Sequence, residues 1–116
     1  MTTEAEIIQK AGAGKSATFD TAMMTAANIR AESMVNCMAR RDLSTLYATG
    51  LTDTGKFILN DICSSFVAIE AITYDMSGYT SRVEAEDMIN VLRDGLLRNL
   101  SILRDEKVLR FLLNDV

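Results

Sequence analysis

A glycine-rich segment that ends in Lys-Ser is the first place where the chain could do chemistry. Residues 11–16 read Ala-Gly-Ala-Gly-Lys-Ser, which matches the end of the loop pattern that cradles nucleotide phosphates. The complete pattern needs an earlier glycine and a preceding buried strand. That glycine would fall at Gln9, and residues 4–10 have a helical pattern. We therefore predict a small-residue loop here and no nucleotide site.

The other reactive residue types are scarce. The chain has no histidine, which removes the commonest general base and the commonest metal ligand together. Acidic residues at Glu84, Glu86 and Asp87 do not all share one helix face, and a role at a helix start explains them without a metal. We predict no enzymatic activity, no cofactor, no metal and no small-molecule substrate.

Cys37 and Cys63 each fall within a helical pattern. The acidic start Met-Thr-Thr-Glu-Ala-Glu lacks the apolar run of a secretory signal. We therefore predict a protein made in the cytosol, with both cysteines as free, small, buried thiols. No segment is predicted to be long and apolar enough to span a membrane.

Composition favours one all-α domain. The chain has 116 residues, of which 48% are hydrophobic, and it contains no proline. That length corresponds to a single domain with a modest core, and nothing forces a helix to kink. The net charge of −4 argues against nucleic acid as a primary ligand, because phosphate binding needs clustered Lys and Arg.

Helical patterns cover most of the chain and predict an all-α bundle of about four helices. Their expected ranges are residues 3–11, 20–41, 53–75 and 81–103, with a looser turn or short helix over 42–47. Thr3 with Glu6, and Ser81 with Glu84, each match the capping-box pattern of a helix start. Residues 1–19 are treated as an N-terminal arm that either orders alone or orders only on assembly.

Each long pattern has an expected apolar face. The second helix should bury Met23, Ala27, Ala31, Met34 and Met38. The third should bury Phe57, Ile58, Leu59, Ile62, Phe66, Val67, Ile69 and Ile72, and the fourth Ala85, Ile89, Leu92, Leu96, Leu100 and Leu103. Gly95 predicts close packing against another helix. Glu70 could lie at a helix edge or be a buried carboxylate with a raised pKa.

The segment between the two longest C-terminal patterns is neither plain helix nor plain loop. It reads Tyr-Asp-Met-Ser-Gly-Tyr-Thr-Ser-Arg over residues 74–82. One interpretation is a Gly-containing helix corner in which Asp75 pairs with Arg82. The other is a contact surface, because Tyr and Arg are common interface anchors. The candidate subunit-contact residues are Tyr74, Asp75, Tyr79, Arg82, Arg40 and Phe111; Phe111 is expected to pack either on this chain's own core or on a neighbour.

This segment also carries a resemblance to a known group. The run Ala-Ile-Glu-Ala-Ile-Thr-Tyr-Asp-Met-Ser-Gly-Tyr-Thr-Ser-Arg-Val-Glu-Ala-Glu-Asp-Met-Ile-Asn-Val over residues 68–91 resembles small bacteriophage structural proteins of the head–tail connector type, also called neck adaptors or head-completion proteins. Residues 11–13, 39–42 and 103–108 are similar to that group as well. The chain departs from it at Arg41 and Leu43, where an aromatic is expected, so the end of the second helix is less secure as a contact.

The resemblance implies a helical adaptor that forms a ring, expected to be dodecameric, under the portal protein. Such a ring would extend the DNA passage, touch DNA only non-specifically, and dock a further neck or tail protein. The chain would be made in the bacterial cytoplasm and end in the neck of the virion. No catalytic or ligand-binding residue is implied.

Two other functions remain open. One is a different virion role, such as a capsid-associated protein or a tail terminator. The other is a small helical chaperone or regulator that binds a partner helix in an apolar groove.

Overall fold

Most helices of the chain begin at a side chain that caps the first turn. Thr3 accepts a hydrogen bond from the backbone N–H of Glu6, whose carboxylate accepts from the Thr3 N–H at 2.9 Å, so the predicted capping box is confirmed. Ser81 likewise accepts from the N–H of Glu84 at 3.1 Å. The helix that begins at Asp53 is capped by Thr52, which accepts from the N–H of Gly55 at 3.2 Å.

The computed structural model describes residues 1–12, 15, 17–47, 50–75, 78–79, 81–105, 107 and 110–111. Within these residues it contains five helices and no strand, so the all-α prediction is confirmed. The helices are α1 (Glu4–Ala11), α2 (Thr21–Ala39), α3 (Leu43–Leu46), α4 (Asp53–Tyr74) and α5 (Arg82–Leu103). The expected short element over residues 42–47 is the single-turn helix α3.

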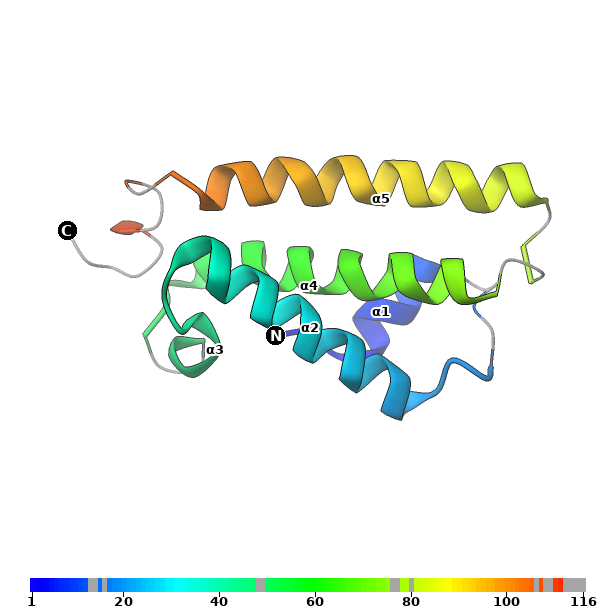
Figure 1. Cartoon of the computed structure of the whole chain (residues 1–116), viewed down its shortest axis with the longest axis horizontal. Helices are drawn as coiled ribbons and strands as arrows, with labels where there is room; N and C mark the ends of the chain where they lie inside the picture. The colour runs from blue at the N-terminus through cyan, green and yellow to red at the C-terminus, as the bar shows by residue number, and fades with distance from the viewer. Residues whose placement is uncertain are drawn as a thin grey trace.

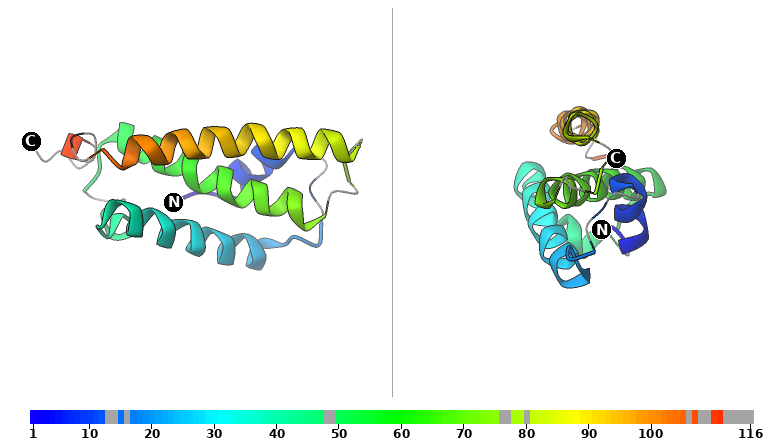
Figure 2. Two further views of the ribbon diagram at one scale, coloured as in Figure 1. Left: turned by 45° about the horizontal axis from the view of Figure 1, so that its top comes forward. Right: turned by 90° about the vertical axis from the view of Figure 1, so that its right-hand side faces the viewer.

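Helix α4 is the central element of the bundle. It packs against α5 on one side and against α1 and α2 on the other (Figure 1). Seen along the long axis, α5 stands alone above α4, whereas α1 and α2 flank the opposite side (Figure 2). Helix α5 therefore has a neighbour mainly on the side that faces α4.

The core runs along α4 in two clusters. One surrounds Leu59 and Ile62 near the start of α4, and the other surrounds Val67 and Ile72 near its end. From α5, the first cluster receives Leu96, Leu100 and Leu103, and the second receives Ala85, Ile89 and Leu92, as predicted. Ile7 and Ala11 of α1 are also buried, so the first helix belongs to the core.

The buried face of α2 differs from the prediction. Its fully covered residues are Met24, Ala27, Ala31, Val35 and Ala39. The predicted Met23, Met34 and Met38 are half-buried at the rim of the clusters. The small side chains Ala27, Ala31 and Ala39 let α2 approach α4 closely, and the flexible methionines fill the edges of the contact.

Three further expectations are wrong. Phe57 is 74% exposed, because it points away from both clusters at the start of α4. Cys37 is exposed on the outer side of α2, whereas Cys63 is buried as predicted. Among the described residues, a Cβ added at Gly95 would meet only the Arg98 guanidinium, at 3.9 Å, so none of the described helices packs closely there.

The membrane expectation also needs correction. Helix α4 is long and apolar enough, by length and composition, to cross a membrane. Half of its apolar stretch is buried inside the bundle, because α4 is surrounded by α1, α2 and α5 and needs apolar residues on most sides. The same composition is therefore explained by its central place in the bundle.

Candidate interaction surfaces

The corner between α4 and α5 is held from inside by Tyr79. Its ring is 9% exposed, and its hydroxyl donates a 2.6 Å hydrogen bond to the backbone carbonyl of Ala11. Burial, together with the nearby Glu84 carboxylate, raises the pKa of Tyr79. Tyr79 thus ties the corner to the end of α1, and its side chain faces the core.

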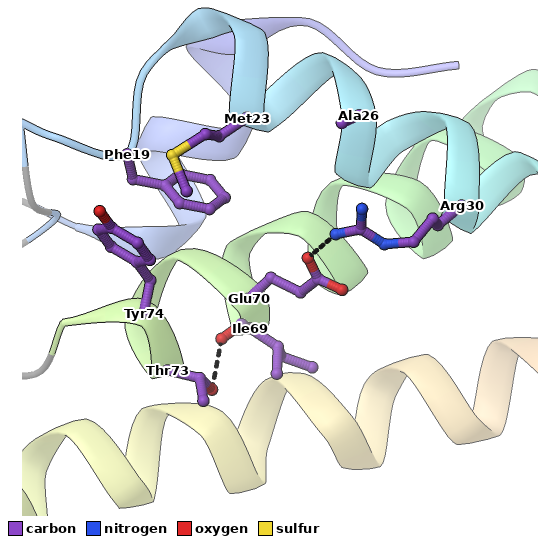
Figure 3. Close-up of a pocket in the computed structure, with 8 residues that line it drawn as sticks. All are labelled: Phe19, Met23, Ala26, Arg30, Ile69, Glu70, Thr73 and Tyr74. Carbon is purple, nitrogen blue, oxygen red and sulfur yellow. Dashed lines mark hydrogen bonds and ion pairs between the residues drawn. The ribbon is translucent and has the colours of Figure 1, made fainter.

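Tyr74 lies on the surface, in a groove between α2 and α4 (Figure 3). Its ring is 49% exposed and tilted against the ring of Phe19, with the two centroids 5.5 Å apart. The side chain of Met23 lies over the Phe19 ring. The groove encloses about 490 Å³ and is lined by Phe19, Met23, Ala26, Arg30, Ile69, Glu70, Thr73 and Tyr74. We call it the α2–α4 groove.

One wall of the α2–α4 groove is ionic. The Arg30 guanidinium reaches from α2 to the Glu70 carboxylate on α4 and forms an ion pair with it. The side chain of Glu70 is 32% exposed, so this residue lies at the helix edge, which was one of its two predicted places. The groove therefore combines an aromatic end with a paired charge, a mixture typical of protein contact sites.

The outer side of α5 carries large apolar side chains that nothing in the described chain covers. Val83, Val91 and Leu97 are 65%, 71% and 55% exposed. They do not form one stripe: Leu97, six residues after Val91, lies about 120° away from it around the helix. A second groove, of about 590 Å³, runs beside α5 toward α1 and is lined by Lys10, Ser81, Val83, Glu84, Asp87, Met88, Val91 and Leu92. Apolar surface gathered on one element marks a contact site.

The remaining predicted contact residues are spread over both ends of the molecule. Arg82 is exposed and pairs with Glu86 at 3.2 Å, and Asp75 follows α4 as its half-buried C-terminal cap. Arg40 ends α2 in the left-handed conformation, with φ of 56°. Phe111 is 61% exposed. The structure thus brings Tyr74, Asp75 and Arg82 to one end and leaves Arg40 and Phe111 at the other, and their role in a subunit contact stays a prediction.

Sequence reasoning missed a polar cluster that joins three helices. The Lys10 ammonium of α1 pairs with the Asp61 carboxylate of α4 and donates to the Ser65 hydroxyl at 2.9 Å. The other Asp61 carboxylate oxygen accepts from the Asn99 amide of α5 at 2.5 Å. The available signal was Asp61 itself, an acid in the middle of the most apolar helix.

The described residues contain no group of three or more His, Cys, Asp or Glu placed to hold a metal. Burial raises the pKa of the Cys63 thiol to about 12, with the N-terminal ammonium opposing and Glu32 adding to the shift. Cys63 therefore stays a neutral thiol and a poor nucleophile.

Comparisons with known proteins add no family. No family model, no curated protein and no solved structure matches the chain.

Proposed function

We propose that the chain is a virion structural protein of the head–tail connector type, which forms a ring on the portal and links the capsid to the tail. The observation that carries the proposal is the set of large apolar side chains that α5 leaves exposed. Val83, Val91 and Leu97 lie on a helix that only α4 covers substantially. Such a surface is explained when a neighbouring subunit or virion protein packs on it.

The connector role itself rests on the resemblance of residues 68–91 to small phage neck proteins. Within that run, Tyr79 is buried and its hydroxyl donates to the Ala11 carbonyl. Tyr74 and Arg82 belong to the packed helices α4 and α5, so their backbone needs little further ordering to contact a neighbour. The net charge of −4 suits a passage through which DNA must slide, because an acidic lining does not grip phosphates.

The test is capture by heads. Purified chain is mixed with portal-bearing heads that lack it, and bound protein is measured after sedimentation of the heads. A saturable, stoichiometric load that needs the portal supports the proposal. Heads without portal are the control. Equal binding to heads with and without portal would indicate a capsid-associated role instead. No binding to either kind of head would refute the connector proposal.

A second candidate function is favoured by the α2–α4 groove. Phe19, Met23 and Tyr74 offer an aromatic and thioether surface of the kind that receives an amphipathic helix. A chaperone or regulator of this type would stay monomeric or dimeric and would bind one partner helix. Light scattering of the chain alone, together with capture by portal-bearing heads, separates the two functions, because the connector proposal requires either self-association or assembly on heads and the regulator requires neither.

A further inference from the structure

Two apolar features lie at opposite ends of the elongated molecule. The α2–α4 groove lies toward the end where α4 finishes, at Tyr74. The exposed Phe111 belongs to the segment after α5, and residues 110–111 (red) lie at the other end (Figure 1). The molecule measures 48 Å along this axis and 25 × 21 Å across it.

In the structure, Phe111 of the same chain does not occupy the groove, because the two lie at opposite ends of the molecule (Figure 1). Helix α5 runs antiparallel to α4 and ends beside the start of α4 (Figure 1). Residues 110–111 follow this end, whereas the groove lies beside the last residues of α4.

The two ends carry opposite charge. At the end that holds Phe111, the described residues of 40–56 and 98–111 include seven Lys or Arg and three Asp or Glu. At the end that holds the groove, the described residues of 10–20 and 70–87 include three Lys or Arg and six Asp or Glu. The net charges of these described residues are therefore +4 and −3. Such ends attract when copies line up in one direction and repel when like ends meet.

We infer that the α2–α4 groove receives Phe111 of a second copy, so that copies associate head to tail. The Phe111 ring packs beside Phe19 and Tyr74 and against the Met23 thioether, where aromatic and sulfur contacts are favourable. The contact is heterologous, because each copy uses its Phe111 end to bind one neighbour and its α2–α4 groove to bind the other. Such contacts close into a ring when the rotation between copies permits it. This inference deepens the proposed ring and rests on it.

The occupant is a second copy because residue type and charge both match within one chain. An exposed aromatic residue at a basic end meets an aromatic groove at an acidic end. A different partner would need to bring the same basic and aromatic pair. That alternative is an outcome of the test below.

The test uses two single substitutions that damage opposite halves of the contact. Phe111→Ala removes the inserted ring, and its matched control is Phe57→Ala, which removes another exposed phenylalanine. Ala26→Trp fills the groove, and its matched control is Ala22→Trp, at an exposed position of α2 that does not line the groove. Circular dichroism and thermal unfolding confirm that each variant keeps the fold.

Self-association is measured by sedimentation velocity over a wide range of concentrations. Phe111→Ala and Ala26→Trp should each weaken it about thirtyfold, the loss typical of a central interface residue. The two controls should associate like the original chain. When the two damaged variants are mixed, the intact Phe111 of one should bind the intact groove of the other and give a one-to-one dimer. Salt at about 0.5 M should weaken every association, because the charged ends are screened.

Other outcomes overturn the inference. The inference fails if the original chain stays monomeric, or if Phe111→Ala and Ala26→Trp associate as strongly as the original chain. A mixture of damaged variants that stays monomeric would exclude the reciprocal contact. If Ala26→Trp abolishes capture by heads without changing self-association, the groove holds another virion protein. If heads capture the chain but the chain does not self-associate, the connector proposal stands and the head-to-tail contact is excluded. If the chain self-associates through this contact but heads do not capture it, the connector proposal fails and the contact stands.

Discussion

Replacing Tyr79 by phenylalanine should destabilise the fold while leaving the surface unchanged. The Tyr79 hydroxyl donates a 2.6 Å hydrogen bond to the carbonyl of Ala11, inside the core. The substitution Tyr79→Phe would keep the ring but leave that carbonyl without its donor. A buried polar group left without its partner costs about 1–3 kcal/mol, and we take about 2 kcal/mol as the expected loss in the free energy of unfolding.

The corresponding change in melting temperature follows from the size of the chain. Unfolding entropy of about 2.1 cal/mol/K per residue over 116 residues gives about 0.24 kcal/mol/K. A loss of about 2 kcal/mol should therefore lower Tm by about 8 °C. Thermal unfolding followed by circular dichroism, with urea unfolding as a second measure, gives both quantities.

Tyr74→Phe is the matched control. The Tyr74 ring is half exposed in the α2–α4 groove, so loss of its hydroxyl should change stability by less than about 0.5 kcal/mol. If the Tyr79 and Tyr74 variants unfold at the same temperature, then Tyr79 does not tie the corner to α1. The claim that the Tyr79–Ala11 hydrogen bond stabilises the fold would then be refuted.

The remaining predictions concern thiols, the polar cluster and Gly95. Cys37 is exposed and Cys63 is buried, so an aromatic disulfide reagent should modify Cys37 quickly and Cys63 only after unfolding. Because the pKa of Cys63 rises from 9.0 to about 12 in the fold, its contribution to stability is complete below pH 9 and lost as pH rises toward 12. Cys63→Ala should therefore flatten the alkaline fall in unfolding free energy, and an unchanged slope would contradict this. Asp61→Ala should lower the free energy of unfolding in urea by about 1–2 kcal/mol, because it breaks contacts to α1 and α5. Glu86→Ala, which breaks the exposed pair with Arg82, should lower it by less than about 0.5 kcal/mol. Equal losses would refute the role of the cluster. Gly95→Ala should raise the free energy of unfolding by about 1 kcal/mol, because the added Cβ meets only the Arg98 side chain, at an ordinary contact distance. A loss of stability would mean that another group packs against Gly95.

Local features of the fold were predictable from the sequence. The helices, the capping box at Thr3 and the cap at Ser81 depend on residues within one or two turns of each other. The apolar face of α5 was also predicted correctly. It has a single neighbour, α4, along most of its length, so its hydrophobic period points in one direction.

Features that depend on distant residues were not predictable. The choice of Met24 and Val35 over Met23 and Met34 on α2 is made by the fit of small side chains against α4. The pair of Lys10 and Asp61 joins residues 51 positions apart. Tyr79 bonds to Ala11 across 68 positions, so its type alone could not show whether it faced the core or a neighbour.

The α2–α4 groove was likewise beyond a reading of the sequence. Tyr74 was singled out because of its residue type and its place beside a turn. Its neighbours Phe19 and Met23 come from the start of another helix, and only the packing of α2 on α4 brings them together. A groove between two helices depends on how they pack, and it leaves no repeating pattern in the sequence of either helix.

The central claim is that the chain assembles on the portal of a phage head. The most direct measurement is the number of copies bound per head, by quantitative mass spectrometry of portal-bearing heads that lack the protein, after saturation and sedimentation. The account predicts a fixed load that corresponds to one ring per portal and is absent from heads without portal. A load that follows capsid surface, or no load at all, would contradict it.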